Sequence, residues 1–308
     1  MGGVLVGFAI IAAVIGVGYL IARIGLLPEG SSPVLSRLAF FVLMPPLLFT
    51  VLAEADTGRL FSELLPISAI AGVAQIVVFA AIARLVWRRA VPETTIGALS
   101  SGYVNANNIG LPVSLYVLGD ATVAVPVLLL QVIVIAPIAL TILDATTSGK
   151  VSVGRILLQP IRNPLIIAST LGLAVALSGI ELPAPVLAPF ELIGAAGIPV
   201  ILIAFGMSLH GRRPLAPGPE RKDVILASIL KLAAMPLVAW ALAHFVWGLE
   251  GHTLFAVVVL AALPTAQNVF TFAQRYGRGV VIARDTVLVT TAFSIVALVA
   301  IAALLAPG

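Results

Sequence analysis

Two short polar segments interrupt long apolar runs, and their side chains are amides rather than acids. The first contains Asn105, Asn107 and Asn108, followed by Gly110 and Pro112. Each amide offers hydrogen-bond donors and an acceptor, and it is costly in an apolar environment unless it is partnered. Because glycine and proline also weaken a helix, we expect two half-helices joined by an extended linker. The chemistry of such a linker is neutral hydrogen bonding to a polar or anionic ligand.

The second segment has the same character. Pro264 breaks the apolar run, and Thr265, Gln267 and Asn268 follow it. Non-helical backbone at membrane depth is tolerated only where it is buried in protein or lines a wet cavity. The N-terminus of a half-helix carries a partial positive charge, so two breaks that meet at mid-membrane favour an anion. We therefore predict that both segments bind substrate. The alternative is that each is a kink whose amides only satisfy freed backbone groups.

Lys231 lies about nine residues into another apolar run. An ionisable residue at that depth is a functional candidate, here for attracting an anion or for proton coupling. The alternative is that its long stem lets the ammonium group snorkel to the interface. Neither break contains a carboxylate, and the three histidines lie too far apart for a metal site. We expect no cofactor and no metal, with sodium coupling, proton coupling and uniport all left open.

The elements that position these residues are membrane-spanning helices. Apolar residues make up 61% of the chain and charged residues only 10%, whereas about a quarter of a soluble protein is charged. A run of about 20 apolar residues can cross a bilayer. The fold class is therefore an all-α integral membrane protein, and the first run reads as a span rather than a cleaved signal. We count ten spans, at 3–22, 33–53, 63–87, 94–118, 121–143, 163–179, 184–209, 223–248, 252–275 and 283–305.

Charge supports this count. With ten spans, fifteen of the seventeen basic residues fall on one face, Arg59 falls on the other, and Lys231 lies inside a span. Cytoplasmic loops carry an excess of lysine and arginine, so the basic face is predicted to be cytoplasmic. We therefore expect a multi-pass protein of the cell (inner or plasma) membrane with both termini on the extracytoplasmic side.

The ten spans divide into two halves of five, and an odd number of crossings inverts the second half. We expect a first five-helix repeat at 1–145, a cytoplasmic connector at 146–162 and an inverted second repeat at 163–308. Faint internal matches agree with this division, since GLLP at 25–28 pairs with GIELP at 179–183, and TVAV at 122–125 pairs with TVLV at 286–289. The two polar breaks then occupy the fourth and ninth spans.

Several function classes are excluded by missing motifs. The chain has no P-loop for ATP, no HExxH metal site and no recognisable nucleophile–base set. Its basic residues stand singly at the ends of apolar runs, which is typical of membrane topology rather than of nucleic-acid binding. Transport is the favoured function. The alternative is a membrane receptor that binds a ligand without moving it, although the cytoplasmic loops are too short to hold an output domain.

Six segments together resemble the auxin efflux carrier family, which includes plant auxin carriers and bacterial malonate or malate permeases. They are FFVLMPPLLFTVLA (40–53), VNANNIGLP (104–112), RNPLIIASTLGL (162–173), GIPVILIAFGMSL (197–209), KLAAMP (231–236) and LPTAQNVFTFAQRYG (263–277). The resemblance spans nearly the whole chain. It implies a fold similar to bile-acid symporters and sodium–proton antiporters, in which two broken helices cross at the substrate site. It also implies a scaffold domain and a transport domain that move past one another, as in an elevator.

Within the resemblance, Asn105 matches the crossover asparagine that contacts substrate, and Pro264 matches the crossover proline. The residue before Asn105 is valine rather than proline, and the long hydrophilic loop of many plant members is absent. The chain is therefore closer to the bacterial type. The resemblance implies a small organic anion, either a carboxylate or an auxin-like acid, as substrate. The expected partners are this anion and the lipid bilayer, without nucleic acid, and a homodimer is left open.

Overall fold

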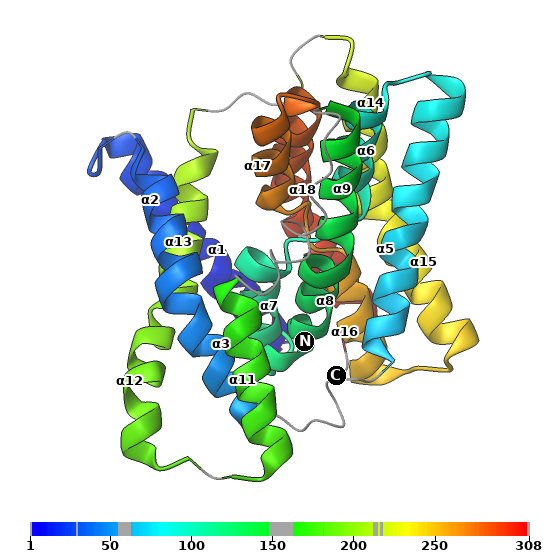
Figure 1. Ribbon diagram of the computed structural model, residues 1–308. Coiled ribbons are helices and arrows are strands. Elements are labelled where there is room, and N and C mark those ends of the chain that lie inside the picture. Colours follow the sequence, from blue (N-terminus) through cyan, green and yellow to red (C-terminus); the bar gives the residue numbers. More distant parts are fainter. Residues whose placement is uncertain are drawn as a thin grey trace.

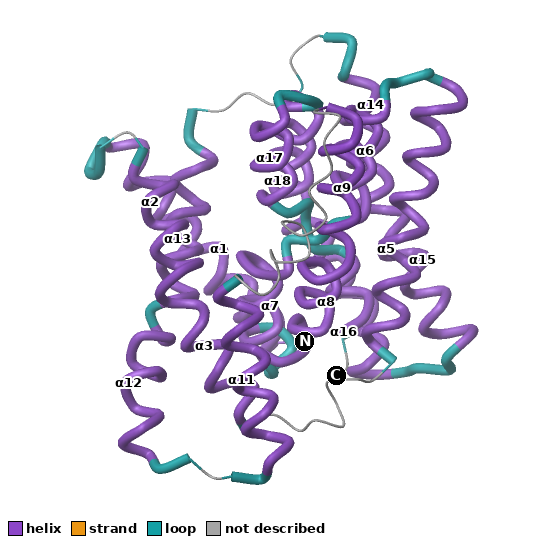
Figure 2. The backbone as a smooth tube through the Cα atoms, viewed as in Figure 1, coloured by secondary structure: helices purple, strands orange, loops and turns teal. Residues whose placement is uncertain are grey.

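The computed structural model describes residues 2–28, 30–54, 63–147, 163–180, 182–211, 215 and 218–306. Within these residues the fold is helical (Figure 2). The one element of β-structure among them is an isolated bridge between Val104 and Thr265. Most of the connector predicted at 146–162 lies outside the described residues.

In the first half of the chain, α-helices are repeatedly interrupted by short π-helical segments, called π-turns below, and by one 3₁₀ turn. In order they are α1 (Gly2–Ile24), α2 (Ser31–Leu38), the π-turn η1 (Ala39–Leu43), α3 (Met44–Ala53), α5 (Leu64–Ala81), the π-turn η2 (Ile82–Val86), α6 (Val91–Gly102), the π-turn η3 (Ala106–Gly110), α7 (Leu111–Tyr116), the 3₁₀ turn η4 (Ala121–Ala124), α8 (Val125–Leu130), the π-turn η5 (Gln131–Ile135) and α9 (Ala136–Thr147).

The second half has the same character. Its elements are α11 (Pro164–Ser178), α12 (Ala184–Ala195), α13 (Gly197–Leu209), α14 (Arg221–Ile229), the π-turn η6 (Leu230–Ala234), α15 (Met235–Ala241), the π-turn η7 (Leu242–Val246), α16 (Gly251–Ala261), α17 (Gln267–Tyr276) and α18 (Val280–Leu305).

Six helical segments of the described residues are long and apolar enough to cross a membrane. They are Ser31–Ala53, Leu64–Val86, Ala121–Thr147, Ala184–Leu209, Arg221–Val246 and Val280–Leu305. Shorter apolar helices cover Ala9–Ile24, Pro164–Ser178 and Gly251–Ala261. Together these segments identify a helical membrane protein, as the composition predicts.

The helices pack into two groups (Figure 1). In the first group, α1 packs on α13, and α3 packs on α11 and α12. In the second group, α5 packs on α6, α15 and α16, while α14 and α18 pack on each other. Figure 1 shows α2, α3, α11, α12 and α13 on the left and α5, α6, α14 and α15 on the right.

Glycines bring helix backbones together inside each group. A Cβ atom on Gly206 of α13 would lie 2.0 Å from the Ile15 carbonyl oxygen of α1. In the second group, a Cβ atom on Gly102 of α6 would lie 2.3 Å from the Gly72 carbonyl oxygen of α5. In lipid, helices associate through such close packing because the apolar solvent gives little other driving force. Each group is therefore held by contacts that admit no larger side chain.

Candidate functional site

The two predicted breaks meet at one antiparallel crossing. Helix α6 ends at Gly102 and helix α16 ends at Ala261. The linkers that follow pair through the bridge between Val104 and Thr265. Across this bridge, the Asn105 N–H donates to the Pro264 carbonyl at 2.8 Å, and the Ala266 N–H donates to the Tyr103 carbonyl at 3.1 Å. Each linker thus satisfies backbone groups that the other has freed, as irregular backbone inside a membrane requires.

Asn105 forms the turn between the linker and the next half-helix. Its backbone angles of φ −77° and ψ 64° are those of an inverse γ-turn, which the Ala106 N–H closes by donating to the Val104 carbonyl at 2.8 Å. Its Oδ1 atom accepts from the Asn108 N–H at 3.1 Å and so caps the half-helix. Its Nδ2 atom is buried and has no partner in the described structure. An orphaned buried donor of this kind calls for an explanation such as a ligand.

The other amides connect the two linkers. Asn107 Nδ2 donates to Asn108 Oδ1 at 2.9 Å, and Asn108 Nδ2 donates to Gln267 Oε1 at 3.3 Å. The Oδ1 atom of Asn107 is buried without a partner among the described residues. The amides therefore form a chain across the crossing that leaves both a donor, on Asn105, and an acceptor, on Asn107, available.

A cavity of about 220 Å³ lies beside the crossing. The chain contains five asparagines, and all five line this cavity: Asn105, Asn107, Asn108, Asn163 and Asn268. Tyr103 and Gln131 add further polar groups, and Phe40, Leu140 and Phe272 contribute apolar wall. No charged side chain is among the described lining residues. The site is therefore a neutral, amide-rich pocket.

The N-terminus of α17 also faces this cavity, through the lining residues Ala266 and Asn268. Its N-cap residue, Ala266, supplies no side-chain cap. The first N–H groups of a helix have no partner within the helix, and together they attract negative charge. The cavity thus combines amide donors with an uncapped helix N-terminus, an arrangement suited to an anion.

Two side chains satisfy the outer edges of the crossing. With the Gln131 amide turned so that nitrogen and oxygen exchange places, its nitrogen donates to the Val104 carbonyl at 2.8 Å and its oxygen accepts from the Val104 N–H at 3.3 Å. On the opposite edge, the Thr265 N–H donates to Thr290 Oγ1 at 3.1 Å. The crossing is therefore held by side chains of two further helical segments, η5 and α18.

Several predicted site residues shape the crossing without lining the cavity. Thr265 is fully buried, and its hydroxyl donates to the Ser100 carbonyl at 2.6 Å. Pro264 accepts from Asn105 through its carbonyl, and Gln267 accepts from Asn108. Gly110 and Pro112 are buried in the half-helix beyond the turn. That these residues contact substrate stays a prediction. In the structure they hold the crossing and the half-helix beyond it in place.

Lys231 lies away from the cavity. Its side chain is fully buried in the π-turn η6, so the ammonium group does not snorkel to the interface. Its Nζ atom donates to the Ala261 carbonyl at 3.1 Å and contacts Met235 Sδ at 2.8 Å. Ala261 is the last residue of α16, where the partial charge of the helix dipole is negative, so a cation is favourable there. A part in coupling or in attracting an anion stays a prediction.

Three lining residues with polar side chains were not among the predicted site residues. The Tyr103 hydroxyl is hydrogen-bonded to the side chain of Asn268. Gln131 is an isolated polar residue in an apolar run, which does not indicate whether its side chain faces the cavity or another helix. Asn163 caps α11 by accepting from the Leu165 N–H at 2.9 Å. An asparagine before a proline predicts the start of a helix. Whether that start lies at the cavity depends on how helices distant in the sequence pack.

Comparison with known proteins bears on this site. A family model described as "Membrane transport protein" matches residues 4–302. A curated protein of Rhizobium meliloti (strain 1021), named "Putative malonate transporter", is 28% identical over 288 residues, which cover 90% of this chain and 88% of that protein. Both names are those of transporters rather than enzymes.

Proposed function

We propose that this chain, which belongs to the auxin efflux carrier family of membrane transport proteins, is a secondary carrier or uniporter for a small organic anion. The gathering of all five asparagines around one cavity of about 220 Å³ is the observation on which the proposal rests. Sites for drug-sized ligands span roughly 300–1,000 Å³, so this cavity favours a smaller solute. The name of the Rhizobium meliloti relative makes malonate the first substrate to test.

The chemistry of the cavity supports an anion. An unsatisfied buried donor costs about 1–3 kcal/mol, and a carboxylate oxygen that accepts from Asn105 Nδ2 would remove that cost. A hydrogen bond to a charged acceptor contributes about 1.5–3 kcal/mol, more than a neutral one. The uncapped N-terminus of α17 adds its partial positive charge. A site built from neutral groups also lets the anion leave, because no fixed counter-charge holds it.

The proposed architecture is ten spans in two inverted repeats, 1–145 and 163–308, joined by the connector 146–162. Two corners of the structure support it, Trp87–Arg89 after η2 and Trp247–Leu249 after η7. In each corner, two N–H groups donate to carbonyls five and six residues earlier, at 3.1 and 2.8 Å in both. The middle residue has positive φ in both, 53° at Arg88 and 63° at Gly248. Each corner precedes a helix that ends in a break.

The proposed motion is elevator-like alternating access between the two packed groups. The cavity lies where they meet, since Phe40 and Asn163 belong to the first group and the crossing belongs to the second. Phe272, Leu140 and Asn163 lie in the parts of their helices nearest the basic face. We infer that this state faces the cytoplasm of a cell membrane, with both termini on the other side.

A counterflow experiment tests the function. Purified protein is reconstituted into liposomes loaded with unlabelled malonate, and entry of labelled malonate is followed under imposed proton, sodium and voltage gradients. Wild-type protein should accumulate label, and Asn105→Ser and Asn268→Ala should accumulate much less at the same malonate concentration. Gln274→Ala, which removes an exposed amide from the same helix as Asn268, serves as the matched control and should transport normally.

The same liposomes separate transport from its alternatives. Acetate and an indole carboxylic acid, offered as competitors, define the substrate class. Binding of malonate without counterflow would contradict transport and indicate a receptor. Normal counterflow by both asparagine variants would contradict the assignment of the site. The response to each gradient identifies proton coupling, sodium coupling or uniport.

A further inference from the structure

A cluster of basic residues lies at the corner that follows η2, at the opposite end of α6 from the crossing. Arg84, Arg88 and Lys222 are exposed around Trp87, and we call these four residues the corner cluster. The Arg84 guanidinium donates to the Arg89 carbonyl, which holds it at the corner. The Lys222 ammonium lies 4.8 Å from the centroid of the Trp87 ring, a cation–π contact that joins α14 to the corner.

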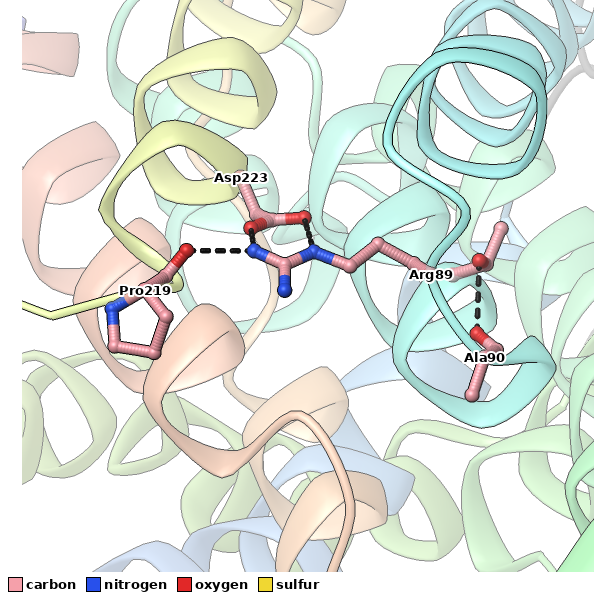
Figure 3. Close-up of polar contacts among 5 residues, drawn as sticks. Arg89, Ala90, Pro219 and Asp223 are labelled. Carbon is pink, nitrogen blue, oxygen red and sulfur yellow. Dashed lines mark hydrogen bonds and ion pairs between the residues drawn. The ribbon is translucent and has the colours of Figure 1, made fainter.

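The acids near the corner do not neutralise this cluster. Asp223 is buried and is occupied by Arg89, whose Nε donates to Asp223 Oδ1 at 3.1 Å while Nη2 contacts Oδ2 of the same carboxylate (Figure 3). Arg89 also donates to the Pro219 carbonyl at 2.6 Å. Glu93, on α6, is paired with Arg278 at 3.4 Å. Glu220 is one remaining acid beside Lys222, so the corner keeps an excess of positive charge.

Arg88 holds a backbone conformation that disfavours any residue with a Cβ atom. Its φ is 53°, in the left-handed region, which costs free energy for L-residues other than glycine. The related corner after η7 has Gly248 at this place, with φ 63°, where the conformation carries no such cost. The same corner can therefore be built with glycine. An arginine at this strained position indicates that its side chain contributes something outside the fold itself.

An apolar groove of about 300 Å³ is lined by residues of α5, α6, η5 and α9, and α5 leads from it to the corner. Val73, Ile76 and Ala80 line it from α5, and they share one helix face because they are three and four residues apart. Arg84 follows Ala80 by four residues and continues that face to the basic end. The hydroxyls of Thr94 and Thr95 in the groove donate to helix carbonyls, both at 2.9 Å, so they leave the groove apolar in character.

The corner faces lipid. Leu85 and Val86, between Arg84 and Trp87, are 78% and 69% exposed, which places this turn at the hydrocarbon surface rather than inside the protein. Tryptophan with arginine or lysine at a helix end marks the headgroup region of a bilayer. Along α5, the apolar groove is thus followed within four residues of Ala80 by basic side chains at headgroup level.

We propose that the corner cluster and this groove bind one anionic phospholipid of the cytoplasmic leaflet. Arg84 and Arg88 bind its phosphate, Lys222 and Trp87 face the rest of the headgroup, and one acyl chain lies in the groove along α5. Charge selects an anionic lipid over a zwitterionic one, because the unneutralised cations of the corner are matched only by a headgroup with net negative charge. The acyl groove selects a lipid over free phosphate.

Native mass spectrometry of the detergent-purified protein tests this site, with phosphatidylglycerol and phosphatidylcholine of matched chains as probes. Wild-type protein should retain phosphatidylglycerol preferentially. Each of Arg84→Gln and Arg88→Gly should weaken that binding about fivefold, from the usual contribution of a basic residue near an anionic surface. Arg23→Gln, at an exposed position of α1 in the other packed group, is the matched control and should bind as wild type does.

Arg88→Gly also separates lipid binding from folding. Glycine relieves the strained φ, so in lipid-free detergent this variant should melt at or above the wild-type temperature while losing the stabilisation that phosphatidylglycerol gives. Equal retention of the two lipids by wild-type protein would overturn the proposal. Unchanged lipid preference in both variants, or displacement of the lipid by glycerol phosphate as effective as displacement by intact phosphatidylglycerol, would also overturn it.

Discussion

Replacement of Asn105 by serine separates the two tasks of this side chain. Asn105 Oδ1 caps the half-helix through the Asn108 N–H at 3.1 Å, and Asn105 Nδ2 is the buried donor that lacks a partner. Serine is as good an N-cap as asparagine, so Asn105→Ser should keep the cap. It cannot supply the Nδ2 donor. We therefore expect a protein with wild-type stability and weakened anion binding.

The expected loss follows from the strength of one charge-assisted hydrogen bond. A bond to a charged group contributes about 1.5–3 kcal/mol, which corresponds to a malonate Kd raised about 10- to 150-fold. Asn105→Ala should show the same loss of binding and should also lose about 0.5–2 kcal/mol of stability with the cap. Asn105→Asp keeps the acceptor but places a like charge near the substrate, worth about 4 kcal/mol of repulsion at 4 Å and an effective dielectric constant of 20, so binding should be abolished.

Binding of labelled malonate and thermal melting, measured on the same detergent preparations, decide between these outcomes. The expected pattern is a melting temperature kept in Asn105→Ser and lowered in Asn105→Ala, with weakened binding in both. A wild-type Kd in Asn105→Ser would refute the assignment of Nδ2 as a substrate donor. An equal fall in melting temperature in both variants would refute the separation of cap from donor.

Three further changes test the crossing and the packing around it. Gln131→Leu leaves the Val104 N–H without its partner, while the Val104 carbonyl keeps the Ala106 N–H, and it should cost about 1–3 kcal/mol of stability. The melting temperature checks this, and equal melting of Gln131→Leu and the exposed control Gln274→Leu would contradict it. Gly102→Ala puts a Cβ atom 2.3 Å from the Gly72 carbonyl oxygen and should destabilise the protein by about 1–3 kcal/mol. Gly16→Ala, whose Cβ position has nothing within 4 Å, should leave stability unchanged. Equal melting temperatures of the two variants would count against rigid glycine packing. Lys231→Met removes a buried amino group that does not line the cavity, so the malonate Kd should stay within about twofold. A tenfold weaker Kd would show that this amino group acts on the substrate.

The positions of both breaks could be predicted from sequence because the signals are local. Three asparagines with a glycine and a proline disfavour a helix at 105–112, and Pro264 does so in the later segment. The structure has a non-helical linker at 103–105 and at 262–266, whereas residues 106–112 are helical, in η3 and the start of α7. The composition likewise predicted a membrane protein, because a surface surrounded by lipid must be apolar along the whole chain.

Which polar side chains line the cavity and which only hold the crossing could not be predicted, because this depends on contacts between segments distant in the sequence. Thr265 and Gln267 carry the same kinds of groups as Asn268, but Thr265 is held by Ser100 and Gln267 by Asn108, while Asn268 lines the cavity. Asn163 reaches the cavity only because the start of α11 faces the crossing.

Lys231 shows the same limit. Its depth in an apolar run is a property of the sequence, but its direction depends on the packing of α16 against its own helix. The structure places its ammonium group on the Ala261 carbonyl, neither at the interface nor in the cavity. The π-turn η6 that contains Lys231 could not be predicted either, because one widened turn changes the hydrophobic periodicity too little to be recognised in the sequence.

The central claim, that a small organic anion occupies the asparagine-lined cavity from the cytoplasmic side, is tested most directly by substrate protection of a single cysteine. The chain contains no cysteine, so Val132→Cys places one thiol in the cavity without background. In inside-out membrane vesicles, a membrane-impermeant maleimide should label this thiol, and malonate should slow the labelling. Gln274→Cys, exposed on α17, should label at the same rate with or without malonate. Labelling of Val132→Cys that malonate leaves unchanged, while counterflow of malonate is intact, would contradict the account.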